Sequence, residues 1–297
     1  MNVPRRNHYI PQFYLKNFTI NNLLYEYDKA NNNTECRSPR GVGWHPYFNI
    51  FIDYHLRKNA GLEIFLNFTE DRAAVAIQKI IKNDALSDPE MVDFIFFLSM
   101  MNFRVPKFKK YVRENFLEKE KNDFFEEFKS IEKRKEFIQD FNNKTKKQTG
   151  ITTDNFFEKV YVSDEAFEDG VFFSYMIKSA FDNVKEFIKK DWYFIKTQND
   201  NFFITSDDPL ATLKAATYKL KALEAIKRDN STDLYIVPIS KNLVLFLFKN
   251  DSNEELSIKG RFELNKTDAV IEIDRMILQE SFNFIYSPNL KTVKNSI

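Results

Sequence analysis

The chain has 297 residues, of which 43% are hydrophobic, so it is long enough to bury a sizeable core in one large or two small domains. Its 44 basic and 43 acidic residues nearly cancel, which excludes a global field that would steer the protein to nucleic acid or to an anionic membrane. A single cysteine, Cys36, excludes an intrachain disulfide and a cysteine-based zinc cluster, and it is typical of a reducing cytoplasm.

The apolar runs are too short to cross a bilayer. The most apolar ones, residues 94–101 and 171–177, fall well short of the roughly 20 residues that a transmembrane helix needs. Residues 1–20 lack the unbroken apolar core of a signal peptide. We therefore expect a soluble, cytoplasmic protein with no membrane partner.

The first part of the chain predicts short elements and irregular structure. Pro11 suits the first turn of a short helix, because the N–H that proline lacks has no partner at that position. Residues 23–28 predict a strand. Residues 29–61 hold most of the turn-forming asparagines, prolines and glycines and predict irregular structure.

Helical periodicity begins at Leu62 and dominates up to residue 190. Residues 87–90, Ser-Asp-Pro-Glu, predict a capping box at the start of a helix that is apolar on nearly all sides. Pro106 is expected to end or kink that helix. Residues 108–143 are highly charged with one apolar stripe, which predicts one or two amphipathic surface helices, and Asp164 is expected to cap another long helix.

The pattern changes to strands at Asp191. Two hairpins are predicted, each across a polar turn: 192–197 with 202–205, and 234–238 with 243–248. The segment between the hairpins, 211–228, predicts a helix. Residues 265–284 predict a final amphipathic helix, followed by a frayed tail.

Together these elements predict one α+β domain over residues 1–297. A mainly helical body would cover roughly residues 60–190. A small antiparallel sheet would form from the late hairpins in 191–250 and the early strand at 23–28. No internal repeat and no linker divides the sequence.

The densest polar stretch lies near the N-terminus, in residues 5–16. If Pro11 starts a helix, His8 lies just before it and Gln12 lies in its first turn, where free N–H groups favour an anion. Arg5 and its basic neighbours add positive charge, and His8 is suited to general acid or base catalysis near neutral pH. The alternative is that His8 only pins the N-terminal segment through a hydrogen bond to a backbone carbonyl.

A second polar stretch, Ser206-Asp207-Asp208-Pro209, follows a predicted buried strand. Carboxylates at a strand end are well placed to hold Mg²⁺ or to orient a water molecule. Asp208 before Pro209 is also a natural N-cap for the next helix. That explanation leaves Asp207 without a structural role, so Asp207 is the stronger functional candidate.

Other residues offer further carboxylates and a cation. Glu63 and Glu70 are seven positions apart, so one helix would present both on the same face, where they serve the site or only complement the helix dipole. Arg104 ends the most buried helix and either clamps a substrate phosphate or pairs with the last carbonyls of the helix. His45 and His55 lack the spacing of a zinc site.

Several segments occur here in an order that resembles a known family. They are His8-Tyr9-Ile10-Pro11-Gln12-Phe13-Tyr14-Leu15, Glu63 with Glu70-Asp71, Phe203-Ile204-Thr205-Ser206-Asp207-Asp208-Pro209 and Val237-Pro238-Ile239-Ser240. Over nearly the whole chain they resemble domain-of-unknown-function family 4238, which is widespread in bacteria. The resemblance implies a stand-alone cytoplasmic protein, and some relatives are associated with defence against bacteriophage. It implies no particular chemistry.

The two polar stretches lead to a functional hypothesis. We expect a phosphodiester-cleaving effector, acting on RNA or a nucleotide in phage defence, with His8 and Asp207 in one solvent-open cleft. His8 would transfer a proton, and Asp207 would orient a water molecule or a metal ion. The candidate substrate contacts are Arg5, Gln12, Tyr14, Arg104 and Ser206, and the candidate Mg²⁺ ligands are Asp207, Asp208 and Glu63.

Two alternatives stay open. The chain could be a non-enzymatic sensor or binding module, with the N-terminal motif as a structural clasp and the 32 phenylalanines serving a partner interface. It could also be a toxin that acts through protein contact alone. No P-loop, dinucleotide-binding glycine pattern, nucleophile elbow or kinase motif is present in the sequence, which excludes those enzyme classes.

Overall fold

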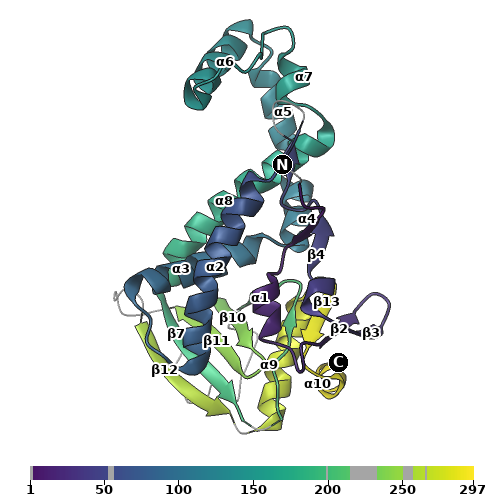
Figure 1. Cartoon of the computed structure of the whole chain (residues 1–297), viewed down its shortest axis with the longest axis vertical. Coiled ribbons are helices and arrows are strands. Elements are labelled where there is room, and N and C mark those ends of the chain that lie inside the picture. The colour runs from purple at the N-terminus through teal and green to yellow at the C-terminus, as the bar shows by residue number, and fades with distance from the viewer. Residues whose placement is uncertain (1–2, 53–56, 199, 215–232, 250–256, 265) are drawn as a thin grey trace.

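The structure combines a layered α+β body with a projecting helical arm (Figure 1). It is a computed structural model that describes residues 3–52, 57–198, 200–214, 233–249, 257–264 and 266–297. Helices dominate the body, so the predicted α+β class is confirmed. The strands divide into two main sheets rather than one.

The larger sheet has five strands in the order β12-β7-β11-β10-β9. Its strands are β7 (Lys190–Thr197), β9 (Ala211–Lys214), β10 (Asp233–Ser240), β11 (Leu243–Lys249) and β12 (Ser257–Leu264). Neighbours are antiparallel except β12, which runs parallel to β7. The hairpin predicted from 234–238 and 243–248 is confirmed as β10 and β11.

The other predicted hairpin, 192–197 with 202–205, is wrong. β7 pairs with β11 and β12 instead. Phe203 and Ile204 are both fully buried as the chain crosses from one sheet to the other. The Asp274 carboxylate accepts the Ile204 N–H at 3.0 Å and takes the place of a strand partner.

The helix predicted at 211–228 is also wrong at its start, where residues 211–214 form the edge strand β9. Ala211 and Leu213 are both buried, whereas Thr212 between them is exposed. This alternation is that of a strand and not of a helix. The remainder of the predicted helix, from residue 215 on, lies outside the described residues.

The second sheet has four strands in the order β3-β2-β13-β8. They are β2 (Leu24–Asp28), β3 (Asn33–Arg37), β8 (Thr205–Ser206) and β13 (Phe284–Ser287). The predicted early strand is confirmed as β2. Residues 33–37, expected to be irregular, form β3, and α10 (Leu290–Ser296) follows β13 where a frayed tail was expected.

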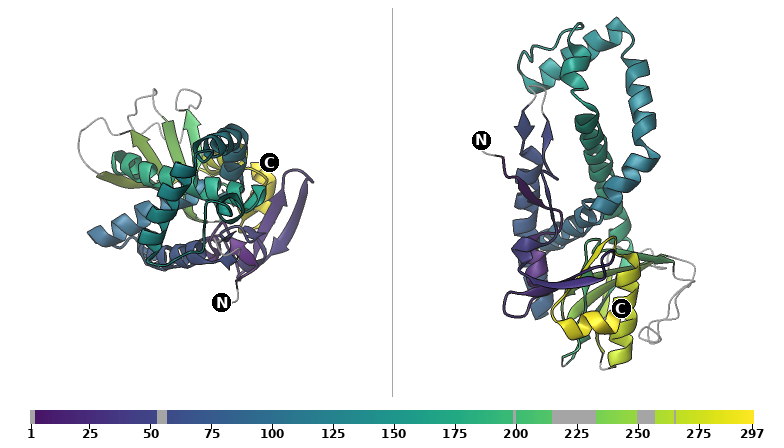
Figure 2. Two further views of the ribbon diagram at one scale, coloured as in Figure 1. Left: turned by 90° about the horizontal axis from the view of Figure 1, so that it is seen from above. Right: turned by 90° about the vertical axis from the view of Figure 1, so that its right-hand side faces the viewer.

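A layer of long helices covers the larger sheet (Figure 2): α2 (Gly61–Lys82), α3 (Asp88–Phe103) and α8 (Asp164–Ile188). α3 packs between α2 and α8, and its Phe94 ring lies 5.6 Å from the Trp192 ring of β7, measured between centroids. The predicted capping box is present, with the Ser87 N–H donating to Glu90 at 2.8 Å. Ser163 rather than Asp164 caps α8, because its hydroxyl accepts the Ala166 N–H.

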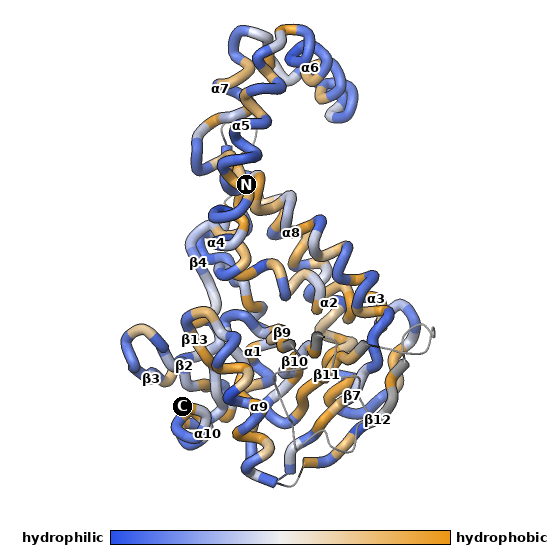
Figure 3. The backbone as a smooth tube through the Cα atoms, turned by 180° about the vertical axis from the view of Figure 1, so that it is seen from behind, coloured by the Kyte–Doolittle hydropathy of each residue, from blue (hydrophilic) through white to orange (hydrophobic). Residues whose placement is uncertain are grey.

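Three helices, not one or two, occupy the charged segment after α3: α4 (Pro106–Asn115), α5 (Leu117–Glu127) and α6 (Ile131–Thr145). α5 and α6, with α7 (Phe156–Val160), form the arm (Figure 1). The arm has its own hydrophobic cluster, centred on Phe128, Ile151 and Phe156. In Figure 3, hydrophobic residues concentrate along β7 and β11, whereas α6 is mostly hydrophilic.

Short elements bring the N-terminal motif against the body. They are β1 (Arg6–His8), α1 (Gln12–Lys16), the 3-10 turn Pro39–Gly41, β4 (Trp44–Pro46), β5 (Phe51–Ile52) and β6 (Lys58–Asn59). β1 pairs with β4, with Asn7 opposite His45. α9 (Thr267–Glu280) accounts for most of the predicted last helix. Within the residues given above, no helix is both long and apolar enough to cross a bilayer.

Candidate functional site

The N-terminal and late polar motifs meet in the core. The Tyr14 hydroxyl lies 2.8 Å from Thr205 Oγ1 and donates to the Pro238 carbonyl at 2.6 Å. Tyr14 is fully buried, and burial raises the pKa of its hydroxyl. The predicted role of Tyr14 is substrate contact, but in the structure its hydroxyl is held by protein groups.

His8 ends β1 at the edge of the body. Its Nδ1 lies 3.4 Å from Gln12 Nε2, while its Nε2 is buried and has no hydrogen-bond partner among the described residues. Burial lowers the pKa of His8 to about 4, although the Arg40 backbone opposes the shift. The positive charges of Arg6, Arg104 and Arg40 lower this pKa further.

His8 and four charged or amide residues around it form one group, which we call the N-terminal polar cluster: His8, Asn49, Glu63, Glu70 and Arg104. Asn49 Nδ2 donates to Glu63 Oε2 at 2.7 Å and lies 3.5 Å from the His8 carbonyl. Arg104 pairs with Glu70 at 2.7 Å. Glu63 and Glu70 thus reach the cluster from one face of α2, as their spacing predicts.

Arg104 is the most buried cation of this cluster, with 2% of its surface exposed. Its Nε donates to the Tyr9 carbonyl at 3.4 Å, so it joins α3 to the N-terminal motif. Burial raises the pKa of Glu70, and the Arg104 charge opposes that rise. The sequence left open whether Arg104 binds substrate or helix carbonyls, and in the structure it binds Glu70 and the Tyr9 carbonyl.

Two buried amides near His8 lack partners for polar atoms. Asn7 is fully buried, and neither its Nδ2 nor its Oδ1 makes a hydrogen bond among the described residues. Asn49 Oδ1 is also unpaired. Each such group costs about 1–3 kcal/mol unless water or a ligand satisfies it. Sequence reasoning missed both residues, because it did not predict the strand β1 that buries Asn7.

Asp207 holds the start of β13. Its two carboxylate oxygens accept the backbone N–H groups of Phe282 at 3.0 Å and Asn283 at 2.8 Å. Burial raises the pKa of Asp207 to about 6, and these backbone donors oppose the shift. The sequence missed this role because the donors lie some 75 residues further along the chain.

Tyr9 is the residue of the N-terminal motif that faces this carboxylate. Burial, and then the charge of Asp207, raise the pKa of the Tyr9 hydroxyl. Burial also raises the pKa of Glu26 to about 7, although Arg37 Nε lies 3.3 Å from its carboxylate. A solvent-open cleft shared by His8 and Asp207 stays a prediction.

The neighbours of Asp207 have structural partners. Ser206 Oγ donates to the Asp208 carbonyl at 2.6 Å, and the Asp208 carboxylate lies 2.7 Å from Lys107 Nζ. The expectation that Asp208 caps a helix is wrong, because the strand β9 follows it. Arg5 is exposed just before β1 and forms no ion pair within the described part of the chain.

The geometry does not fit a magnesium site at the predicted ligands. Asp207 is engaged by backbone N–H groups, Asp208 by Lys107, and Glu63 by Asn49. Among the described residues, no group of three or more His, Cys, Asp or Glu side chains is arranged to hold a metal ion. We therefore derive no step through a metal.

The contact between two motifs so far apart in sequence invites comparison with known families. The sequence model of one family, described as a protein of unknown function (DUF4238), matches residues 6–290. The chain belongs to the DUF4238 family. No curated protein and no solved structure matches this chain. The roles of residues in this DUF4238 chain therefore rest on its own geometry.

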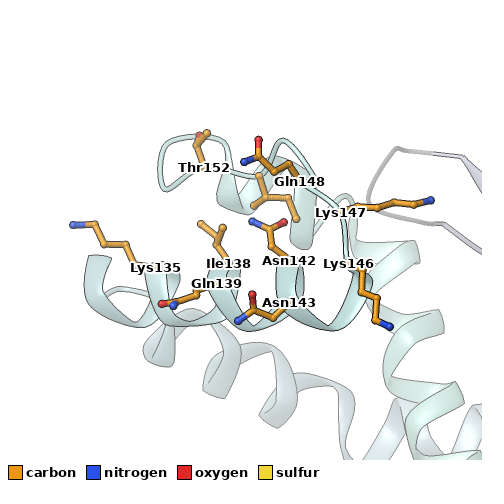
Figure 4. A pocket seen from close by; sticks show the side chains of 10 residues that line it. Lys135, Ile138, Gln139, Asn142, Asn143, Lys146, Lys147, Gln148 and Thr152 are labelled. Carbon is orange, nitrogen blue, oxygen red and sulfur yellow. The ribbon is translucent and has the colours of Figure 1, made fainter.

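The DUF4238 chain also has a hollow of about 630 Å³ on its arm, between α6 and the loop that follows (Figure 4). Lysines and amides dominate its lining: Lys135, Gln139, Asn142, Asn143, Lys146, Lys147 and Gln148. Asn142 Oδ1 accepts the Thr149 N–H at 3.0 Å, so this amide shapes the loop. In Figure 4 the lysine side chains point away from one another, so they do not converge on one ligand position.

Proposed function

We propose that this chain is a phosphodiester-cleaving effector that acts on RNA or a nucleotide at the N-terminal polar cluster, in defence against bacteriophage. One observation carries the chemical part of this proposal. The imidazole of His8 lies beside the Arg40 backbone, its buried Nε2 has no hydrogen-bond partner among the described residues, and it lies in the positive field of Arg6, Arg40 and Arg104. The role in defence rests on the resemblance to the family alone.

The positive electrostatic field around His8 favours an anionic ligand. Arg6 and Arg40 form no ion pair with any described residue, so their charges are available to a phosphate. Arg6 also lies over the Trp44 ring, 4.2 Å from its centroid, which orients the guanidinium. Arg104 is already paired with Glu70, and we assign it a positioning role through the Tyr9 carbonyl.

A bound anionic ligand would also change the pKa of His8, the proposed general base. Without an anion His8 is neutral at pH 7. Gln12 Nε2 can only donate, so Nδ1 is the unprotonated ring nitrogen, and it can accept a proton from an attacking hydroxyl or water. A bound phosphodiester offsets the guanidinium charges and raises the pKa of His8 toward neutrality, where proton transfer in both directions is efficient. We assign the water-orienting carboxylate to Glu63 in place of Asp207, because Asn49 links Glu63 to the His8 backbone.

The test is an activity screen of the purified protein on single-stranded RNA, double-stranded RNA and free nucleotides. We expect cleavage that is lost in His8→Ala and His8→Gln, with melting temperatures near that of the wild type. His45→Ala is the matched control, since His45 is an exposed histidine on the paired strand β4. Full activity in His8→Ala would falsify the assignment.

A non-enzymatic binding module is the second candidate, and the structural bonds of Tyr14 and Asp207 favour it. In this case the motif acts as a clasp and the cluster binds an anion without turnover. Calorimetry with a non-hydrolysable nucleotide would then show binding to the wild type and weaker binding to Arg40→Gln. No substrate in the screen would be cleaved, and His8→Ala would lower the melting temperature.

A further inference from the structure

A row of aromatic side chains crosses the outer face of the helical layer, far from the N-terminal motif in sequence. The Phe65 ring of α2 and the Phe96 ring of α3 are 6.1 Å apart between centroids. Phe96 is in turn 5.6 Å from Phe181 of α8. Phe65 and Phe181 are 43% and 54% exposed, so the row faces solvent.

Further apolar residues extend this row along each helix. Phe68, Val92 and Ile177 are 60%, 61% and 39% exposed. They lie three or four positions from Phe65, Phe96 and Phe181, so each pair shares one face of its helix. We call the six residues the aromatic face.

This face is large for a monomer. Five of its six side chains, all except Phe96, are exposed. A whole aromatic side chain has a surface of about 150–250 Å², so together these five leave roughly 500 Å² of apolar surface in water. A standard protein interface buries ~800 Å² per partner, so the aromatic face supplies more than half of one. It also lies on α2, α3 and α8, which pack together as one layer.

The charges around the face are balanced. Arg72 pairs with Asp93 at 2.9 Å across α2 and α3, and the Arg72 guanidinium lies over the Phe68 ring. Lys185 pairs with Asp182 at 3.2 Å on α8. The face therefore lacks the basic surplus that favours a membrane surface and the single sign that selects a charged partner.

We infer that the aromatic face is the interface of a two-fold symmetric homodimer of this chain. A second copy offers the same apolar surface with the same neutral rim, and the net charge of +1 adds little repulsion between copies. α3 is the middle helix of the layer and carries Phe96, the ring that links the row. The two-fold axis therefore passes near α3, and the α3 helices of both copies lie at the centre of the interface.

The experiment is sedimentation velocity of the full chain over a wide range of concentration. We expect the wild type to sediment as a dimer of the 35.4 kDa chain. The variant Phe68→Glu/Phe181→Glu should raise the dissociation constant by about a hundredfold or more, because it places a charge in the apolar interface on each side of α3 in both copies. Ile131→Glu, at an equally exposed apolar position on the arm, is the matched control and should remain dimeric.

Both substituted phenylalanines are exposed, so the circular dichroism spectrum of the variant should match that of the wild type. A wild type that is monomeric at every concentration would overturn the inference. So would a dimer that survives both substitutions. Co-sedimentation of the monomeric wild type with anionic vesicles, lost in the variant, would assign the face to a membrane and overturn it as well.

Discussion

The hydroxyl oxygens of Tyr14 and Thr205, 191 residues apart in the chain, lie 2.8 Å from each other in the buried core. The same Tyr14 hydroxyl donates to the Pro238 carbonyl on β10. One side chain of the N-terminal motif thus joins both main sheets, because Thr205 is in β8 of the smaller sheet and Pro238 is in the larger. The position of His8 depends on this junction, since His8 lies only six positions before Tyr14 in the chain.

Replacing Tyr14 with phenylalanine should therefore destabilise the protein. The change removes the Tyr14 hydroxyl from two buried groups, the Pro238 carbonyl and the Thr205 hydroxyl, at a cost of about 1–3 kcal/mol. Urea denaturation followed by circular dichroism measures this loss. Tyr111→Phe, at a half-exposed position on α4, is the control. An unchanged midpoint for Tyr14→Phe would show that the junction contributes little.

The imidazole of His8 should titrate at about pH 4 in the free protein. The unfolded chain takes up its proton near 6.5, so between pH 6.5 and 4 the unfolded state binds more protons, and the contribution of neutral His8 to stability is lost as pH falls. Ring-proton NMR measures the pKa, with His8→Gln to assign the signal. Arg40→Gln should raise the pKa, because it removes one of the lowering charges. A midpoint near 6.5 in the wild type would contradict this account of the site.

Asp207 should give the opposite dependence on pH. Its pKa is raised from 3.8 to about 6, so the native state binds more protons in this window and stability falls as pH rises through it. The difference in unfolding free energy between wild type and Asp207→Asn should change by on the order of 1–3 kcal/mol from pH 4 to 6. Denaturation at several pH values measures it, with the exposed Asp84→Asn as control. A constant difference would mean that Asp207 ionises normally.

The pair of Arg104 and Glu70 should behave as a buried ion pair. Arg104→Met alone leaves the partly buried Glu70 carboxylate without its cation and should cost up to about 3–5 kcal/mol. The double variant Arg104→Met/Glu70→Leu should recover most of this loss, because no uncompensated charge remains. Arg113→Met removes a pair with Glu168 whose arginine is exposed to solvent, and it should cost less than about 1 kcal/mol. If the double variant is no more stable than the single one, Arg104 stabilises the fold by another route.

The elements that sequence reasoning predicted correctly are those whose signals are local. The capping box at Ser87 and the apolar stripes of α2 and α8 lie within a few turns of one helix. The pairing of β8 with β13 joins residues about 80 positions apart, and no periodicity encodes it. The alternation at Ala211 and Leu213 was too short to be distinguished from a helical pattern.

The same limit applies to the candidate site. Sequence spacing placed Glu63 and Glu70 on one face of α2, and Arg104 at the end of α3, as the structure has them. It could not show that the Asp207 carboxylate binds backbone N–H groups, because any segment of the chain can supply such donors. It also could not show that Asn7 is buried, since β1 has three residues and exists only through its pairing with β4.

The arm should unfold separately from the body. Phe156 is fully buried in a cluster with Phe128 and Ile151, and this cluster is separate from the core beneath α3. Phe156→Ala should lower the free energy of unfolding of the arm by about 3–5 kcal/mol. This loss exceeds the stability expected of so small a cluster, so the arm should unfold. Hydrogen exchange should then show loss of amide protection in α5–α7 with protection in α3 unchanged, and the exposed Ile131→Ala should change neither. Equal loss of protection in α3 would instead support the prediction of one domain over residues 1–297, because the arm and the body would then unfold together.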